Sequence, residues 1–292
     1  MIGAVLVVYE PDLALTERLL TRLYGQTEEV VIVDNSAIPN DFSKVIEHYH
    51  YIHFPENLGI AAAHNAGLIF LLKAGCEYAL LLDQDSLIPS NMVFDLSSLF
   101  KASKQKNMQN IVAIGPRIKC TFSDKNVRSL VQQEVFEYED LVGVTQIIAS
   151  GMMIDLSALD QIGLKDESLF IDGVDHEWCW RARSMGMSIA RAKKVEMIHR
   201  LGDSRSKFIG VTYKVGAPIR LYYQFRNILL LSRRGYVPVY WKIRCLFFMP
   251  IRFFLNSVMQ KNRRQRLGFM LRGIYDGILG RTGAYKNHWY EK

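Results

Sequence analysis

The sequence lacks the cysteine patterns that cross-link small secreted domains or bind zinc. Its 292 residues contain four cysteines, Cys76, Cys120, Cys179 and Cys245, with no C-x-x-C pair and no regular spacing. We therefore expect reduced thiols in a cytosolic setting, and neither a zinc site nor a disulfide framework. A chain of this length can bury a stable core without such cross-links.

Long uncharged apolar runs are also missing. No stretch reaches the roughly 18 apolar residues that a membrane span needs, because Lys73 and Glu77 interrupt residues 68–82, and Arg252 interrupts residues 246–255. The apolar start MIGAVLVVYEPD follows no basic segment and meets an acid within its first ten residues. It predicts a first β-strand rather than a signal peptide. The chain shows no internal repeat and no low-complexity tract.

Acidic residues are scarce in the C-terminal part of the chain. Residues 214–292 contain 16 lysines and arginines and two acids, a net charge of +14, whereas residues 1–213 carry −7. Basic residues alternate with aromatic and aliphatic ones over residues 217–275, a pattern typical of helices on anionic membrane surfaces. A packed helical subdomain or an oligomer contact would have a similar composition. No nucleic-acid-binding motif is present, so we expect no nucleic-acid partner.

Short apolar runs alternate with helical periodicity in the first 90 residues. The runs predict buried strands at 3–8, 29–33, 51–54 and 78–82, with helices at 13–24 and 60–73. Asp12 is a candidate N-cap of the first helix and Gly25 a candidate stop. The later chain predicts strands at 111–115 and 146–154, a helix beginning within 172–183, a loop at 210–216, and helices after 217. This order indicates an α/β fold with a mostly parallel central sheet flanked by helices.

Polar residues follow three of the predicted strands. They are Tyr9-Glu10, Asp34-Asn35 and Asp83-Gln84-Asp85. Ligands of open α/β sheets bind beyond the carboxyl ends of the strands, so we expect these clusters to meet along one edge.

Asp83 and Asp85 are candidate metal ligands. Two carboxylates two residues apart at a strand end can reach one Mg²⁺ or Mn²⁺ ion, which prefers oxygen ligands and often bridges to substrate phosphates. A solvated turn is the alternative, because Asp is common in turns. For Asp34, contact with a base or ribose hydroxyl competes with an Asx-turn around Asn35.

Two later segments contain further candidates. Small residues at 57–67 let a helix pack tightly and let a ligand approach the backbone, although a well-packed helix opening explains them equally. In residues 171–181, Asp175 is either a helix N-cap or a general base aimed at the cleft. Glu177 and Arg181 are spaced to pair on one helix face. His199 is either structural or a metal ligand.

Together these segments resemble glycosyltransferase family 2, the inverting enzymes of GT-A fold, and especially bacterial rhamnosyltransferases of surface-polysaccharide (O-antigen-type) assembly. The matching pieces occur in family order over about residues 3–205: VVYEPD, VIVDNS, NLGIAAAHNAGL, LLLDQDS, ASGMMI, LFIDGVDHEWCWRAR and HRLGDS. Two positions depart from the family pattern. Val174-Asp175 stands where many relatives have Glu-Asp, which makes Asp172 and Glu177 rival bases, and His64 stands where many have Arg.

The resemblance implies a role for each matching residue. The catalytic base is Asp175, and the metal ligands are Asp83, Asp85 and His199. The nucleotide-sugar site comprises Val8, Tyr9, Asp34, Asn57, Gly59, Asn65, Asp83 and Gln84. The acceptor site comprises Ser150, Gly151, Asp172, Glu177 and Trp178.

The resemblance also implies the reaction and its setting. A GT-A catalytic domain would span residues 1–213, followed by a basic, aromatic-rich helical region at 214–292. With Mg²⁺ or Mn²⁺, the enzyme would move L-rhamnose from dTDP-L-rhamnose to a saccharide or lipid-linked saccharide. It would act in the cytoplasm, peripherally on the cytoplasmic face of the inner membrane, and its partners would include a second copy of the chain in a homo-oligomer. The alternatives are another nucleotide-sugar donor, a nucleotidyltransferase, or a non-catalytic sugar-nucleotide or membrane-binding protein of the same fold.

Overall fold

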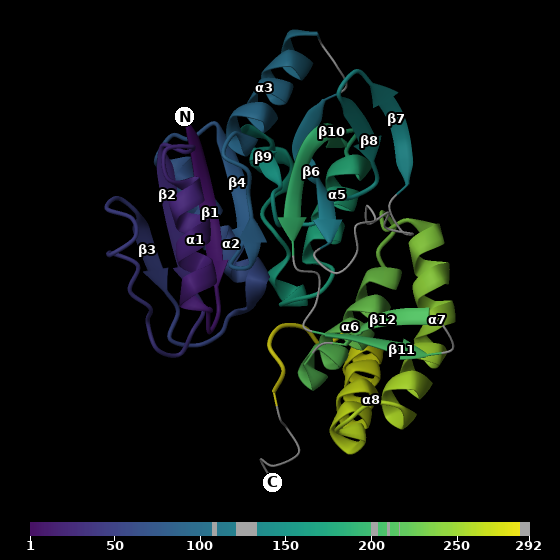
Figure 1. Ribbon diagram of the computed structural model, residues 1–292. Coiled ribbons are helices and arrows are strands. Elements are labelled where there is room, and N and C mark those ends of the chain that lie inside the picture. The colour runs from purple at the N-terminus through teal and green to yellow at the C-terminus, as the bar shows by residue number, and fades with distance from the viewer. Residues whose placement is uncertain (107–109, 121–132, 200–203, 209–210, 216, 287–292) are drawn as a thin grey trace.

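The computed structural model describes residues 1–106, 110–120, 133–199, 204–208, 211–215 and 217–286 (Figure 1). Its strands are β1 (Ile2–Val8), β2 (Glu29–Asp34), β3 (His50–His53), β4 (Tyr78–Asp83), β5 (Ser86–Leu87), β6 (Ile111–Cys120), β7 (Glu134–Tyr138), β8 (Leu141–Val144), β9 (Met153–Asp155), β10 (Ser188–His199), β11 (Ser204–Phe208) and β12 (Val211–Val215). Its α-helices are α1 (Leu13–Leu23), α2 (Gly59–Lys73), α3 (Met92–Gln105), α4 (Leu159–Ile162), α5 (Val174–Ser184), α6 (Pro218–Ser232), α7 (Val239–Val258) and α8 (Arg263–Leu279).

A mixed sheet of ten strands runs through the described part of the chain. Its order is β3-β2-β1-β4-β9-β6-β10-β8-β7, and β5 pairs with β10. The first four strands in this order are mutually parallel, whereas β9 is antiparallel to both β4 and β6. The α/β fold with a central sheet flanked by helices is therefore confirmed, and the parallel part lies where the sequence alternates strand and helix.

The valine-rich first strand is buried on both faces, which explains its continuous apolar run. Val5 and Val7 belong to the core under α2 and α5, whereas Leu6 and Val8 belong to the core under α1 and α3. Alternate side chains of one strand point to opposite faces. The helices that the sequence predicts between the strands therefore cover both faces of the sheet.

Small residues in α2 allow this helix to approach the sheet closely. A Cβ atom added at Gly67 would lie 2.3 Å from Cγ1 of Val5. The first helix begins as expected, because the Asp12 carboxylate accepts a hydrogen bond from the Leu15 amide at 3.3 Å. Gly25, just after this helix, has φ +79°, a left-handed conformation that favours glycine.

Two sequence predictions of local structure are wrong. Residues 146–154 do not form one strand: β8 ends at Val144, β9 begins at Met153, and Gly151 turns the chain between them with φ +83°. The expected loop at 210–216 contains β12, which pairs antiparallel with β11. The first error arises because the partners of β9, which are β4 and β6, are distant in sequence.

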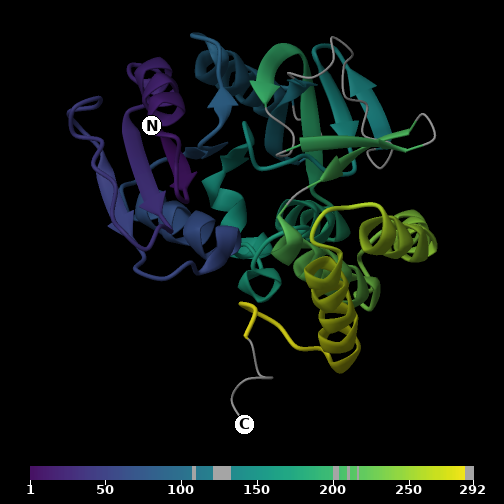
Figure 2. The ribbon, with the colours of Figure 1, turned by 60° about the horizontal axis from the view of Figure 1, so that its bottom comes forward.

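The C-terminal helices α6, α7 and α8 gather on the side of the molecule away from β1–β3 (Figures 1 and 2). Helices α6 and α7 share a core with the preceding part of the chain, in which Ile228 and Leu231 of α6 pack with Leu169 and with Val174 and Trp180 of α5. Among the described helices, none is long and apolar enough to cross a membrane.

Candidate active site at the carboxyl ends of the strands

The ends of β1, β2 and β4 meet at one edge of the sheet. Val8 is in register with Asp34, and Val7 with Asp83. The side-chain amide of Gln84 then joins two of these strand ends, because its Oε1 accepts from the Tyr9 amide at 2.7 Å and its Nε2 donates to the Tyr9 carbonyl at 3.2 Å. The expected convergence of the polar clusters is therefore observed, and the Gln84 amide is engaged by the backbone of Tyr9.

Three carboxylates and one guanidinium lie within electrostatic range of one another at this edge. Burial, then the negative charges of Asp175 and Asp85, raise the pKa of Asp83 to about 7, and Arg220 opposes this rise. Carboxylates that repel one another in this way attract cations. The structure thus brings together the three acids that the sequence predicts at the reaction centre.

Asp175 lies in the first turn of α5, and the N-cap residue of this helix is Gly173. The expectation that Asp175 itself caps the helix is therefore wrong. Its side chain is about one quarter exposed, at 26%, whereas its Oδ1 atom is buried and has no hydrogen-bond partner. The Lys165 ammonium is 4.0 Å from this oxygen. Asp175 thus combines an accessible carboxylate with a buried positive neighbour.

His64 is fully buried and lies within electrostatic range of the Asp175 carboxylate. Neither ring nitrogen has a hydrogen-bond partner. Burial lowers the pKa of His64 to about 4, with Asp175 opposing the change and Lys165 adding to it. A buried neutral imidazole is a poor phosphate ligand, so in this structure His64 does not supply the contact that an arginine would provide.

Asp172 is held by the C-terminal part of the chain. Its carboxylate forms a bidentate pair with Arg220 of α6, with Nη2 to Oδ1 at 2.8 Å and Nε to Oδ2 at 3.3 Å. Asp172 also has a left-handed backbone, with φ +66°. The sequence pattern predicts a basic membrane-facing segment around Arg220, whereas the structure brings this residue within electrostatic range of Asp83. The net charge of +14 on residues 214–292 does not by itself indicate that Arg220 lies at this site.

The predicted acceptor residues Ser150 and Gly151 lie next to the turn that Gln84 and Asp85 form at the end of β4, here called the aspartate turn. The hydroxyl groups of Ser150 and Ser86 are 2.5 Å apart, and the Gly151 amide donates to the Leu81 carbonyl at 2.8 Å. A Cβ atom at Gly151 would lie 2.7 Å from Pro116. Both residues therefore support the aspartate turn, and Ser150 is nearly fully buried.

The predicted metal ligand His199 is the last residue of β10. Its backbone is in register with Ser86 of β5, the residue after Asp85. The His199 side chain lies outside the described residues, as do residues 200–203. Among the side chains that the structure describes, no group of three or more His, Cys, Asp or Glu forms a metal site.

Asp34 is turned into the protein. Its carboxylate is fully buried and accepts hydrogen bonds from the Ser36 amide at 2.8 Å, the Tyr51 hydroxyl at 2.7 Å, and both the backbone and side-chain nitrogens of Asn40. Burial raises the pKa of Asp34, but these hydrogen bonds outweigh it and lower the pKa below its ordinary value. The Asx-turn alternative is present, and contact with a nucleotide would require exchange of these bonds.

The remaining predicted donor-site residues differ in exposure. The Tyr9 side chain is 46% exposed, and Asn57 is exposed and accepts from the Gly59 amide at 2.9 Å. Asn65 is buried and clamps the backbone of Lys165, to which its Oδ1 and Nδ2 bond at 2.8 and 2.9 Å. Gly59 has φ +88° and packs against Phe170. Tyr9 and Asn57 are therefore open to a ligand, whereas Asn65 holds the protein together.

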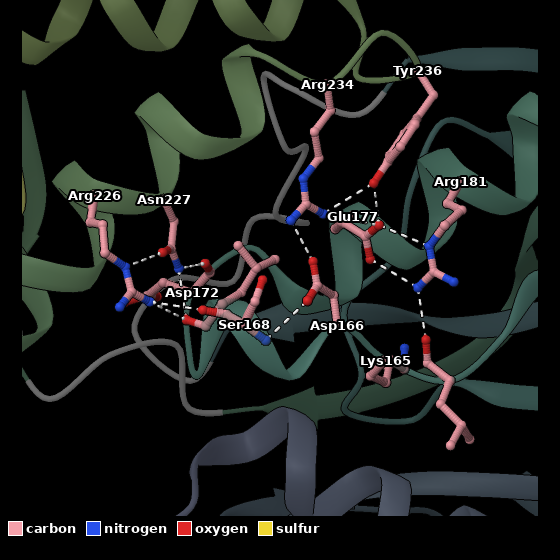
Figure 3. A network of polar contacts seen from close by, with 12 residues as sticks. Lys165, Asp166, Ser168, Asp172, Glu177, Arg181, Arg226, Asn227, Arg234 and Tyr236 are labelled. Atoms are coloured by element: carbon pink, nitrogen blue, oxygen red, sulfur yellow. Dashed lines mark hydrogen bonds and ion pairs between the residues drawn. The ribbon is translucent and has the colours of Figure 1, made fainter. Parts of the chain in front are cut away.

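Glu177 and Trp178 are buried, and Figure 3 shows the partners of the Glu177 carboxylate. The Glu177 carboxylate binds Arg181 at 2.8 Å, as the sequence spacing predicts, and also Arg234 at 3.3 Å and the Tyr236 hydroxyl at 2.5 Å. The Trp178 ring nitrogen donates to the Gly163 carbonyl at 3.0 Å. Both side chains are engaged within the protein, where they connect α5 to the segments around it.

Three side chains near α5 were not found by sequence reasoning: Lys165, Arg226 and Asn227. Arg226 and Asn227 of α6 donate to the carbonyls of residues 168–172, just before Asp175 (Figure 3). Lys165 is fully buried, which is rare for lysine without a partner charge. None of the three belongs to a local sequence pattern, because their partners lie elsewhere in the chain.

The arrangement suits a group transfer from an anionic leaving group. Carboxylates at Asp83 and Asp85 can hold a divalent cation, and an accessible carboxylate at Asp175 can accept a proton. Among protein families, glycosyl transferase family 2 matches residues 5–163, more than half of the chain. The chain belongs to glycosyl transferase family 2.

Curated relatives of this family 2 member are glycosyltransferases. It is 33% identical over 295 residues to the dTDP-rhamnosyl transferase RfbF of Shigella flexneri, with 97% of each chain covered. It is 28% identical over 231 residues to the low-salt glycan biosynthesis hexosyltransferase Agl10 of Haloferax volcanii, covering 74% of this chain and 70% of the relative. The protein is therefore a glycosyltransferase.

Solved structures of glycosyltransferases share the fold of this family 2 member. The S. aureus TarS fragment 1–349 in complex with UDP-GlcNAc matches with a TM-score of 0.56 at 14% identity, covering 95% of this chain and 81% of that fragment. GalNAc-T7 with UDP, GalNAc and Mn²⁺ matches with a TM-score of 0.56 at 11% identity, covering 96% of this chain and 56% of that protein. At such low identity the likeness establishes the GT-A fold alone.

Proposed function

We propose that this glycosyltransferase is an inverting, metal-dependent rhamnosyltransferase that moves L-rhamnose from dTDP-L-rhamnose to a hydroxyl of a saccharide or lipid-linked saccharide. The observation that carries the donor is the 33% identity to a dTDP-rhamnosyl transferase over 97% of both chains. The chemistry is supported by the cluster of Asp83, Asp85 and Asp175 at the ends of the strands.

Asp83, the last residue of β4, and Asp85, just after it, fit Mg²⁺ or Mn²⁺. Both supply oxygen ligands, and their mutual repulsion contributes to raising the pKa of Asp83 to about 7. His199, whose backbone is in register with Ser86, is the proposed further ligand. Oxygen atoms of the donor diphosphate and water would complete the coordination, as is usual for Mg²⁺. The bound ion would neutralise charge that develops on the diphosphate leaving group.

Asp175 is the proposed general base. Its accessible oxygen would accept the proton of the acceptor hydroxyl, whose oxygen then attacks the anomeric carbon from the face opposite the diphosphate and inverts it. Lys165 places a positive charge 4.0 Å from this carboxylate. Exposed Tyr9 and Asn57 are the proposed donor contacts. Asp172, fixed by Arg220, is the proposed acceptor contact.

We place this reaction at the cytoplasmic face of the inner membrane. A lipid-linked acceptor would be presented there, and the net charge of +14 on residues 214–292 suits an anionic surface. The protein would attach peripherally, since no described helix can cross a membrane.

A donor panel tests the substrate. The full-length protein is mixed with dTDP-L-rhamnose, dTDP-glucose, UDP-glucose or UDP-GlcNAc, with and without Mn²⁺, and thermal stability and nucleotide release are measured. We expect stabilisation and slow hydrolysis to dTDP with dTDP-L-rhamnose and Mn²⁺ together. Preference for a UDP-sugar would replace the donor, and binding without hydrolysis or transfer would support the non-catalytic alternative.

The base is tested with Asp175→Asn. The variant keeps the size of the side chain but removes its basicity, so we expect transfer from labelled donor to lipid-linked saccharides to fall by at least about 10²-fold. Donor affinity should change by less than about threefold. Asp160→Asn, at an exposed position of α4, is the matched control and should retain activity. Undiminished transfer by Asp175→Asn would exclude this residue as the base.

A further inference from the structure

Helix α7 leaves most of its surface uncovered. Of its 20 residues, Trp241 alone is buried. The helix lies at the outer edge of the molecule, on the side away from β1–β3 (Figure 1). Large apolar side chains are exposed along its whole length, among them Phe247 at 68%, Ile243 at 64% and Phe254 at 59%.

Six of these side chains form a stripe along one face of the helix. They are Val239, Ile243, Phe247, Ile251, Phe254 and Val258, all exposed. Their spacing of four, four, four, three and four residues places all six within about 120° of one another around the helix axis. A 20-residue helix is about 30 Å long, so the stripe is a continuous apolar ridge of that length. Soluble monomers rarely expose so large an apolar face without a use for it.

Positive charges border this stripe. Lys242 and Arg244 stand one residue before and after Ile243, about 100° to either side of it on the helix. The Lys242 ammonium donates to the Arg234 carbonyl at 2.6 Å. The long side chains of both residues can keep an apolar stem against the stripe with the charge at its margin. The Arg244 guanidinium already lies 5.0 Å from the centre of the Phe248 ring. Residues 217–275 contain no acid to neutralise these cations.

This combination identifies the class of partner. A two-fold contact between copies would bring the same surface of each chain together. Lys242 and Arg244 of both copies would then repel each other, and α7 offers no acid for them to pair with. An anionic bilayer satisfies both features, because its acyl chains accept the apolar ridge and its headgroups pair with the bordering cations.

We propose that α7 lies in the plane of an anionic bilayer, with the stripe from Val239 to Val258 directed toward the acyl chains and Lys242 and Arg244 at the headgroup level. This inference names the surface for the proposed membrane location and does not depend on the donor or on the base. The helix thereby orients the whole enzyme, because it shares a core with α5 and α6.

Vesicle sedimentation of the full-length protein tests the proposal. Vesicles of phosphatidylcholine alone are compared with vesicles of phosphatidylcholine and phosphatidylglycerol at physiological salt. We expect binding to the anionic vesicles to be at least about tenfold tighter. The double variant Ile243→Asp/Phe247→Asp should lose at least about tenfold in affinity, because it places two charges on the ridge. Phe94→Asp, which charges a 73% exposed position of α3, is the matched control and should bind normally.

A second set of measurements distinguishes a lipid surface from a second copy of the chain as the partner of α7. Lys242→Gln/Arg244→Gln, which leaves the ridge intact, should weaken binding to anionic vesicles and reduce its dependence on salt. Both double variants should retain donor hydrolysis, so that failure of the docking surface is distinguished from failure of the proposed enzyme. Wild-type-like binding by the Ile243→Asp/Phe247→Asp variant would overturn the proposal. So would a concentration-dependent dimer that this variant abolishes and vesicles do not affect, since that result assigns the ridge to a second copy.

Discussion

Lys165 places a fully buried ammonium group beside the proposed base. Its Nζ atom lies 4.0 Å from Asp175 Oδ1, 4.7 Å from the centre of the Trp178 ring and 3.8 Å from the sulfur of Met152. Burial lowers the pKa of Lys165, and the Asp175 carboxylate opposes that change. Removal of one partner of a buried ion pair leaves the other without compensation. The activity of Asp175 should therefore depend on Lys165.

We expect Lys165→Met to lower kcat by at least about tenfold, because the Asp175 carboxylate loses the buried cation beside it. Donor affinity should change little. Lys73→Met, which removes an exposed lysine from α2, is the control. An unchanged kcat in Lys165→Met would show that Asp175 does not depend on this cation.

His64 should make the fold sensitive to acid. Its pKa of about 4 lies below the ordinary value of 6.5, so the unfolded chain binds a proton at this residue before the folded protein does. Stability is therefore lost as the pH falls from about 6.5 toward 4 and is unaffected by this group above that range. Between pH 7.5 and 5 the loss should be about 2 kcal/mol.

His64→Leu should remove this part of the pH dependence. Urea unfolding at pH 7.5 and pH 5 measures the free energy of unfolding of both proteins, and the difference between the two pH values should be about 2 kcal/mol smaller in the variant. His48→Leu, at an exposed position, should leave the pH dependence as it is. Equal acid sensitivity of His64→Leu and the wild type would contradict the buried neutral histidine.

At the scale of elements, α6 fixes the segment that leads into α5. The Asn227 side-chain nitrogen donates to the carbonyls of Leu169, Ile171 and Asp172 at 3.0, 2.8 and 2.8 Å. The fully buried Arg226 donates to the Leu169 carbonyl at 2.9 Å. Arg220 of the same helix holds the Asp172 carboxylate. The helix that follows the expected catalytic domain therefore shapes the site itself.

Asn227→Ala should destabilise the protein by about 2–3 kcal/mol, since it leaves buried carbonyl groups without a donor. It should also reduce transfer, because Asp172 and Asp175 lose their fixed positions. Asn256→Ala, which removes one hydrogen bond to the Arg252 carbonyl and one from the Arg266 guanidinium, should cost less than about 1 kcal/mol. Urea unfolding and initial rates measure both effects. A stable but inactive Asn227→Ala would assign this residue to catalysis rather than to support.

At the scale of the whole molecule, the two expected parts of the chain share their interior. Ile228, Leu231 and Trp241 pack with Val174 and Trp180 across the expected boundary at residue 213. The ion pairs of Arg234 with Asp166 and Glu177 cross it as well. Removal of the C-terminal region would expose this core and leave Glu177 without two of its partners.

We therefore expect a fragment of residues 1–213 to unfold without a cooperative transition, whereas the full chain unfolds in a single steep one. Circular dichroism during urea titration compares the two. For the same reason, point variants on α7 test the membrane surface better than truncation. A sigmoidal transition in the isolated fragment would show that residues 1–213 fold independently.

Local patterns in the sequence are enough to predict the α/β order of the elements and the aspartate turn at the end of β4. Both depend on near neighbours: apolar runs such as that of β1 specify buried strands, and a polar cluster directly after a strand must lie at the sheet edge. The Glu177–Arg181 pair was equally predictable, because residues four apart meet on a helix. The family motifs extended this reasoning to the roles of Asp83, Asp85 and Asp175.

Which polar residues face the site and which face the core depends instead on the packing of distant segments. Asp34, Asn65 and Trp178 belong to the expected motifs yet are buried. Asn65 meets Lys165 across 100 residues, and Arg220 meets Asp172 across 48. Such contacts follow from the packing of helices on the sheet, which brings distant segments together. A local sequence pattern does not indicate these long-range contacts, because each residue type in it can lie either at a ligand site or in the core.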